Sequence, residues 1–142
     1  MIFWIKIFEV GTSGQIACLR HFHINRKNYV DARSHCNSLN SYLVPVKTTE
    51  KLEVLKTLVT SPDTWIGLDD LVTEGRYVWV ADGDTLTPQQ IADSFYAGEP
   101  NNGAGIEHCV AYRTAFQLFN DAGCDNDYGY VCEKTVYAPQ GG

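Results

Sequence analysis

The sequence of 142 residues predicts one α+β domain, with two helices in its first half and short strands around a long irregular loop in its second. Between Asn28 and Val59, apolar residues recur every three or four positions, which indicates buried helix faces. After Val59, short apolar runs alternate with Gly, Asp and Asn, as in strands joined by turns. The length suits a single core and would crowd a second domain, so residues 1–142 are taken as one unit.

The N-terminal segment predicts a hairpin over residues 2–22. Apolar side chains alternate at Phe3, Ile5 and Ile7, and the turn cluster Gly11-Thr12-Ser13-Gly14 precedes a second apolar run at 16–22. The first ten residues lack the small-residue cleavage site of a signal peptide and are too short to cross a bilayer. We therefore expect no membrane insertion and assume the mature form of a secreted protein.

Two helices are expected next. The first begins near Asn28, because four residues share one of its faces: Tyr29, Ala32, Cys36 and Leu39. The second follows Pro45, has Thr48 or Thr49 as its N-cap, and has an apolar face made by Leu52, Leu55 and Val59. Because Cys36 belongs to the apolar face of the first helix, it is expected to point inward.

No further helix is expected beyond residue 63. Apolar runs predict strands at 65–68, 76–81, 109–112 and 128–134, and place Trp65 and Trp79 in the core. Residues 82–106 are rich in Gly and Pro and show no periodicity. Loops of this length are uncommon in compact domains and usually functional, and an ion would anchor this one.

Composition limits the possible partners. The net charge of −6 argues against nucleic acid and anionic membranes, both of which reward clustered Lys and Arg. Five cysteines occur without any Cys-x-x-Cys spacing, which favours disulfides over a zinc site. The odd number leaves one thiol that is either free or joined to another chain.

The triplet Glu99-Pro100-Asn101 offers a carboxylate and an amide oxygen on either side of a rigid residue. Calcium takes 6–8 such oxygens, and more follow at Glu107 and at Asn120-Asp121. A bond before proline also tolerates the cis form, which would hold both flanking side chains on one side of a turn. Taken alone, the triplet is weak evidence for an ion, and turn chemistry favours a plain surface turn.

In chain order, several motifs resemble the C-type lectin domain over about residues 17–134: Ala32-Arg33 with Cys36, Trp65-Ile66-Gly67-Leu68, Gly98-Glu99-Pro100-Asn101, Cys109, Asn120-Asp121, Cys124 and Tyr130-Val131-Cys132-Glu133. The resemblance implies a C-type lectin-like fold with two helices, small antiparallel sheets and a long calcium-binding loop. It also implies the disulfides Cys36–Cys132 and Cys109–Cys124. Cys18 is then left over, either for an interchain disulfide that links a dimer or as a buried free thiol.

The same resemblance implies a set of Ca²⁺ ligands, namely Glu99, Asn101, Glu107, Asn120 and Asp121. The first four would also hydrogen-bond a sugar, and Glu-Pro-Asn goes with mannose, GlcNAc and fucose in the family, whereas Gln-Pro-Asp goes with galactose. Asp70 and Glu74 match part of a possible second metal site. Asn102 and His108 stand where aspartates are usual, so one firm ion is expected.

These observations together predict a secreted, calcium-dependent lectin that binds mannose-type glycans in innate immune recognition. Alternatives are a galactose or GalNAc type, a calcium-independent lectin, or a protein-binding domain of this fold without sugar activity. We do not expect an enzyme, because no Ser or Cys nucleophile has a paired base in the sequence.

Overall fold

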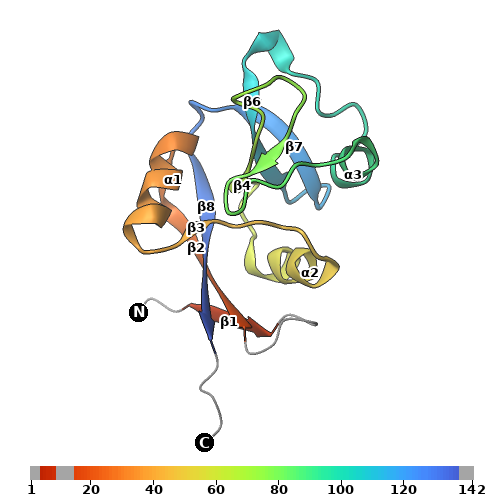
Figure 1. Ribbon diagram of the computed structural model, residues 1–142. Coiled ribbons are helices and arrows are strands. Elements are labelled where there is room, and N and C mark those ends of the chain that lie inside the picture. The colour runs from red at the N-terminus through yellow and green to blue at the C-terminus, as the bar shows by residue number, and fades with distance from the viewer. Residues whose placement is uncertain (1–3, 9–14, 138–142) are drawn as a thin grey trace, which may run out of the picture.

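The computed structural model describes residues 4–8 and 15–137. Its strands form one sheet with the order β1-β2-β8-β4-β6-β7, and β3 and β5 pair with β8 and β4 respectively (Figure 1). The strands are β1 (Ile5–Phe8), β2 (Gln15–Lys27), β3 (Tyr42–Leu43), β4 (Asp63–Asp69), β5 (Val78–Trp79), β6 (Glu107–Arg113), β7 (Leu118–Gly123) and β8 (Tyr128–Tyr137). The helices are α1 (Tyr29–Ser38), α2 (Thr49–Leu58), α3 (Pro88–Ser94) and the 3₁₀ turn η1 (Gly103–Gly105).

The N-terminal hairpin is confirmed, since β1 pairs antiparallel with β2. Its turn cluster lies outside the described residues. β2 continues beyond the expected end at Phe22 as far as Lys27, with an irregularity between these two residues. On its other side β2 pairs with β8, so β2 lies between the first and last described strands of the domain (Figure 1).

Both expected helices form where the apolar pattern placed them. Asn28 caps α1 by accepting a hydrogen bond from the Asp31 backbone N–H at 2.9 Å. Of the two candidate caps for α2, Thr48 is the one that accepts, from the Lys51 N–H at 3.1 Å. Lys51 itself is buried, and its charge is compensated because its Nζ lies 2.5 Å from Glu133 Oε1 of β8. This ion pair joins α2 to the sheet.

A third helix corrects the expectation that none follows residue 63. α3 begins with a capping box, in which Thr87 Oγ1 accepts from the Gln90 N–H and Gln90 Oε1 accepts from the Thr87 N–H. Pro88 occupies the first turn, where its missing N–H costs nothing. Because none of its described residues is buried, α3 lacks the apolar periodicity that revealed α1 and α2.

The core and the covalent links agree with the sequence. Trp65 and Trp79 are 0% and 2% exposed. The disulfides are Cys36–Cys132, which joins α1 to β8, and Cys109–Cys124, which closes the β6–β7 hairpin. They span 96 and 15 residues, closures worth on the order of 4.7 and 3 kcal/mol in the chain-entropy model.

Candidate functional site

Three carboxylates from neighbouring segments of the chain meet at the edge of the sheet opposite β1. One oxygen each from Glu99, Glu107 and Asp121 lies within 4.8 Å of the others. Glu99 belongs to the loop after α3, Glu107 begins β6, and Asp121 lies in β7, which pairs with β6. The fold thus brings together three of the five predicted ligands.

Asp121 anchors the loop that carries the triplet. Its side chain is fully buried, and its two oxygens accept from the backbone N–H groups of Asn101 at 3.1 Å and Asn102 at 2.6 Å. The Glu99–Pro100 peptide bond is cis, as the sequence allowed. Asn101 Nδ2 donates to Glu99 Oε1 at 3.1 Å, so these side chains do lie on one side of the turn.

Glu107 is held from the same loop. Its Oε1 accepts from the Gly103 N–H at 2.7 Å, and its own N–H donates to Asn102 Oδ1 at 3.0 Å. A Cβ atom added at Gly103 would lie 2.6 Å from Glu107 Oε1, which is closer than a carbon can approach. A side chain at position 103 would therefore push the Glu107 carboxylate out of its present position.

The electrostatics of this acidic cluster favour a cation. Burial, followed by the neighbouring carboxylates of Asp121 and Glu107, raises the pKa of Glu99 to about 7. Within the described part of the chain, Glu99 Oε2 is buried without a hydrogen-bond donor. Unpaired buried charge is costly, and a divalent ion between three carboxylates would relieve it. The residues present therefore fit Ca²⁺.

Asn120 is the predicted ligand whose role is least defined. It precedes Asp121 in β7, pairs with Ala111 of β6 and is 7% exposed. Its position beside the cluster suits a ligand, but participation of its amide stays a prediction.

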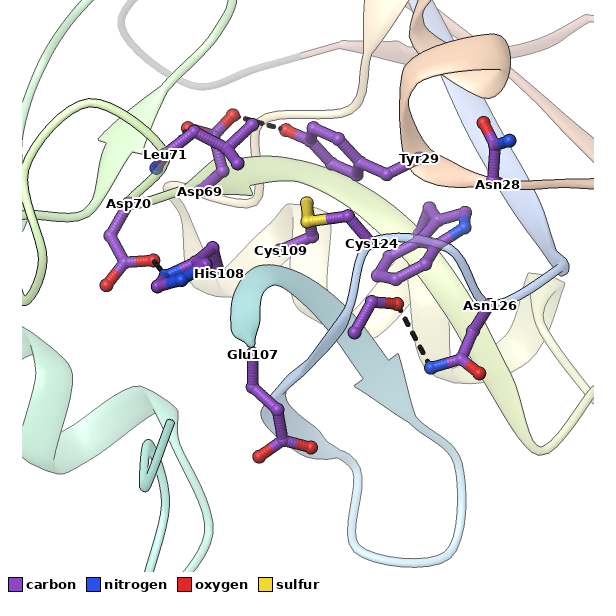
Figure 2. The surroundings of a disulfide bond; sticks show 12 residues. Asn28, Tyr29, Asp69, Asp70, Leu71, Glu107, His108, Cys109, Cys124 and Asn126 are labelled. Carbon is purple, nitrogen blue, oxygen red and sulfur yellow. Dashed lines mark hydrogen bonds and ion pairs between the residues drawn. A yellow bond between two sulfur atoms is a disulfide. The ribbon is translucent and has the colours of Figure 1, made fainter. Parts of the chain in front are cut away.

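A second acidic cluster lies nearby and differs in its donors. Atoms of Asp70, Glu74 and His108 also fall within 4.8 Å of one another. His108 Nδ1 lies 3.3 Å from Asp70 Oδ1 and 4.0 Å from Glu74 Oε2, while its Nε2 lies 3.2 Å from the Gly105 carbonyl oxygen. Figure 2 shows His108 pointing toward Asp70, whereas Glu107 points away from both.

Nitrogen donors already fill much of this second cluster. Asn102 Nδ2 donates to Glu74 Oε1, and the Gly75 N–H donates to Asp70 Oδ2 at 2.8 Å. Burial, followed by the adjacent Glu74, raises the pKa of Asp70 to about 6. Because an amide nitrogen and an imidazole face the space where oxygens would be needed, the fit to Ca²⁺ is poor.

Asn102 connects the two clusters, a role that the sequence did not reveal. Its backbone N–H contacts Asp121, its Oδ1 contacts the Glu107 N–H and its Nδ2 contacts Glu74. Its backbone is left-handed, with a φ of 46°. Asn-Asn-Gly is a typical sequence for such a turn, and this was the available signal.

The comparisons with known proteins agree with this fold. A family model described as Lectin C-type domain matches residues 25–134. The chain belongs to the C-type lectin domain family, which is a family of non-enzymatic lectin domains, and this confirms the expected class.

Individual relatives include a receptor and a lectin. The chain is 33% identical over 142 residues to the low affinity immunoglobulin epsilon Fc receptor of Mus musculus, covering 92% of this chain and 41% of the receptor. It is 31% identical to the hepatic lectin of Gallus gallus, covering 82% of this chain and 54% of that protein. The chain thus spans about half or less of these relatives.

Solved structures give the same result. The carbohydrate-recognition domain of cow CD23, determined in the presence of a GlcNAc2Man3 oligosaccharide, matches with a TM-score of 0.79 and 28% identity over 95% of both chains. The trimeric Kupffer cell receptor Clec4f matches with a TM-score of 0.75 and 31% identity over 94% of this chain and 83% of that one. Among the described residues, no helix has the length and hydropathy needed to cross a bilayer.

The remaining cysteine lies away from both clusters. Cys18 is a free thiol in β2, opposite Lys6 of β1 and Lys134 of β8, and is 3% exposed. This burial favours the free-thiol alternative over an interchain disulfide, which would require β2 to be uncovered.

Proposed function

We propose that this domain is a calcium-dependent lectin whose ion is held by Glu99, Asn101, Glu107, Asn120 and Asp121. The observation that carries the proposal is the buried Glu99 Oε2, which has no donor among the described residues although two other carboxylates surround it. Structural carboxylates at a loop are normally satisfied by N–H groups, as both oxygens of Asp121 are. An oxygen left unsatisfied in such a place fits a ligand atom.

The side chains around the ion supply the sugar contacts. A bound Ca²⁺ would offer coordination positions to two neighbouring sugar hydroxyls. Glu99 and Glu107 would accept hydrogen bonds from these hydroxyls, while the amides of Asn101 and Asn120 would donate to their oxygens. Each hydroxyl then has one donor and one acceptor partner, which fixes the orientation of the sugar ring.

The order of acceptor and donor favours mannose-type sugars. Glu99 places a carboxylate before proline and Asn101 an amide after it, the arrangement that in this family goes with mannose, GlcNAc and fucose. The cow CD23 domain, determined in the presence of a GlcNAc2Man3 oligosaccharide, supports this choice by similarity. A galactose or GalNAc type is the second candidate, because neighbouring loops can rotate a sugar in the site.

We also propose a single ion for each chain. The Asp70, Glu74 and His108 cluster is supplied with donors by Asn102, His108 and the Gly75 N–H. A second Ca²⁺ would have to displace these nitrogens, whereas the first cluster presents an unsatisfied oxygen.

The setting follows from the disulfides. Two disulfides in a small domain indicate an oxidising compartment, and the family is extracellular. We propose secretion and a role in the recognition of glycan surfaces in innate immunity. Single sugar contacts are weak, and pairing of sites raises avidity by about 10²–10⁴, so a dimer would suit this role.

A glycan array read with Ca²⁺ and with EDTA tests the function. We expect binding to mannose-type glycans that EDTA abolishes and excess Ca²⁺ restores. Glu74→Gln should leave the pattern of glycan binding unchanged, and it serves as the control for the effects of substitution and purification. Binding that survives EDTA would overturn the calcium mechanism while keeping the lectin. Absence of binding to every glycan would favour the protein-binding alternative.

A further inference from the structure

The positive charges of the chain are unevenly distributed. The sequence contains 11 Lys and Arg residues against 17 Asp and Glu residues. In the described part of the chain, the cations that have a carboxylate partner belong to α2, to the segment before it and to β6: Lys47, Lys51, Lys56 and Arg113. The remaining cations, except Arg76, belong to β1, β2, α1 and β8: Lys6, Arg20, Arg26, Lys27, Arg33 and Lys134.

Three of these cations project from one face of the sheet. Lys6 of β1 and Lys134 of β8 are both register partners of Cys18 in the strand between them, β2. Directly opposite residues of an antiparallel pair share a face, and so do residues two apart in a strand, which adds Arg20. Lys6 is exposed, and Arg20 and Lys134 are partly exposed. Lys6, Arg20 and Lys134 together are named the cationic face.

Aromatic rings hold two of these side chains in place. Arg20 Cζ lies 4.2 Å from the centroid of the Phe22 ring, and Lys134 Nζ lies 4.4 Å from that of the Trp4 ring. Both distances are within the range of a cation–π attraction. Phe22 in turn stacks on Tyr130 of β8, with ring centroids 5.0 Å apart. Because the rings already restrict these cations, binding an anion costs less side-chain entropy.

The surroundings of Arg20 are rigid and positive. Arg20 is the register partner of Cys132, which the disulfide joins to Cys36 of α1. Burial, followed by the positive charges of Lys27 and Arg20, lowers the pKa of His35 in the same helix. Lys27 therefore lies close enough to extend the positive potential along β2 toward α1.

Carboxylates are scarce around the cationic face. The three strands that carry it contain one carboxylate, Glu133, which alternates with Lys134 and so projects from the opposite face. Glu133 is 3% exposed, and Lys51 Nζ lies 2.5 Å from its Oε1. The acidic cluster of the proposed ion site involves β6 and β7, at the other edge of the sheet. This face therefore keeps a positive local potential although the net charge is −6.

The geometry of the face suits a linear chain with repeated anionic groups. Because strands lie about 4.7–4.9 Å apart, the backbones at Lys6 and Lys134 are separated by about 10 Å, and Arg20 is offset by about 7 Å along β2. The guanidinium fork binds two oxygens of a tetrahedral group such as sulfate, while each Lys supplies a point charge. The rings of Phe22 and Trp4 are covered by cations, which leaves no free platform there for the bases of a nucleic acid.

We propose that the cationic face binds a linear sulfated polysaccharide without Ca²⁺. The disulfides indicate an oxidising, extracellular setting, where sulfated polysaccharides are available. The inference goes beyond the proposed lectin function, because no residue of the cationic face belongs to either acidic cluster. One domain would thus hold a sulfated chain and, on its proposed ion site, a neutral sugar at the same time.

A heparin octasaccharide titrated by calorimetry in EDTA tests the inference. The desulfated, N-acetylated octasaccharide and a single-stranded DNA of equal charge are titrated in parallel. We expect the sulfated probe to bind at least about tenfold more tightly than the desulfated probe, and to lose about tenfold in affinity between 50 and 150 mM salt. Absence of binding in EDTA would overturn the inference and leave the lectin function standing. DNA that binds as tightly would overturn the assignment to sulfated glycans.

Matched double variants locate the binding surface. Lys6→Gln with Lys134→Gln should weaken binding of the sulfated octasaccharide about tenfold, since it removes two cations of the face. Lys56→Gln with Arg76→Gln makes the same change in net charge elsewhere and should stay within about twofold. Both proteins should unfold at the wild-type temperature. Equal losses in the two double variants, or no loss in the first, would overturn the placement.

A measurement on the wild-type chain gives the same information without substitution. The sulfated octasaccharide should protect Lys6 and Lys134 from acetylation by a lysine-reactive ester, read by mass spectrometry, and should leave the acetylation of Lys56 unchanged. Equal protection of all three lysines, or protection of none, would overturn the proposal.

Discussion

The two acidic clusters contain the same number of potential ligands but differ in what surrounds them. At Glu99, Glu107 and Asp121, backbone N–H groups satisfy some oxygens and leave one buried oxygen without a donor. At Asp70, Glu74 and His108, side-chain nitrogens occupy the corresponding positions. The comparison teaches that the donors around a group of carboxylates, as well as the carboxylates themselves, decide whether a cation is needed.

The largest effect is expected on Ca²⁺ affinity, when one glutamate of each cluster is replaced by glutamine. Glu107→Gln removes one of three charges around the proposed ion, and we expect its dissociation constant for Ca²⁺ to rise roughly 100-fold. Glu74→Gln, the matched control, should stay within about threefold. Calorimetric titration measures both. Equal losses in the two variants would mean that the clusters do not differ.

The second largest effect is expected from acid, which should lower the Ca²⁺ affinity of the first cluster. In the ion-free protein the pKa of Glu99 is raised to about 7, so below that pH a proton occupies the carboxylate and must leave when the ion binds. Affinity is therefore full above pH 7 and falls as the pH drops. We expect roughly a tenfold loss between pH 7.5 and 5.5. A flat affinity from neutral pH to about 4.5 would contradict this prediction.

The second cluster should become a weak site when its nitrogen donors are replaced. The double substitution Asn102→Asp with His108→Asp supplies two carboxylates in place of an amide and an imidazole. Aspartates are the residues usual at these two positions in the family. We expect the calorimetric stoichiometry to change from one Ca²⁺ to two. A stoichiometry that stays at one would show that the surrounding backbone, and not the donor type, excludes the ion.

The smallest effect is expected at Cys18, which lies in β2, far from both clusters. Cys18→Ser should leave Ca²⁺ and glycan binding unchanged. The buried thiol also predicts equal migration of the wild-type chain in reducing and non-reducing gels. A dimer band present only without reductant, and absent in Cys18→Ser, would restore the interchain disulfide.

The sequence predicted the parts of the fold that depend on apolar periodicity and on chain-wide motifs. The buried faces of α1 and the positions of Trp65 and Trp79 followed from pattern, and both disulfides followed from the family resemblance. It missed α3, although Thr87-Pro88-Gln89-Gln90 contains a capping box, because no apolar stripe accompanied that signal. It also missed β7 as a strand, since Asn120 and Asp121 interrupt its apolar residues.

The sequence was less informative about the site. The five oxygen donors were visible as residue types, but their hydrogen-bond partners depend on loop geometry. Asn102 and His108 appeared only as departures from an expected acidic pair, whereas the structure shows that both donate into the second cluster or contact it. The folded loops decide which carboxylate oxygen is left without a hydrogen-bond donor, and a sequence motif does not predict this.

The position of β2 between the first and last described strands has a practical consequence. Ile5 of β1 and Tyr137 of β8 both join β2 near its start, with Ile5 opposite Leu19 and Tyr137 opposite Gln15. This end of the sheet lies far from the loops that carry the acidic clusters (Figure 1). A tag, bead or sensor surface attached beyond either strand would therefore hold the loops of the acidic clusters outward. Dense immobilisation would create multivalent display while leaving each proposed ion site open to solution.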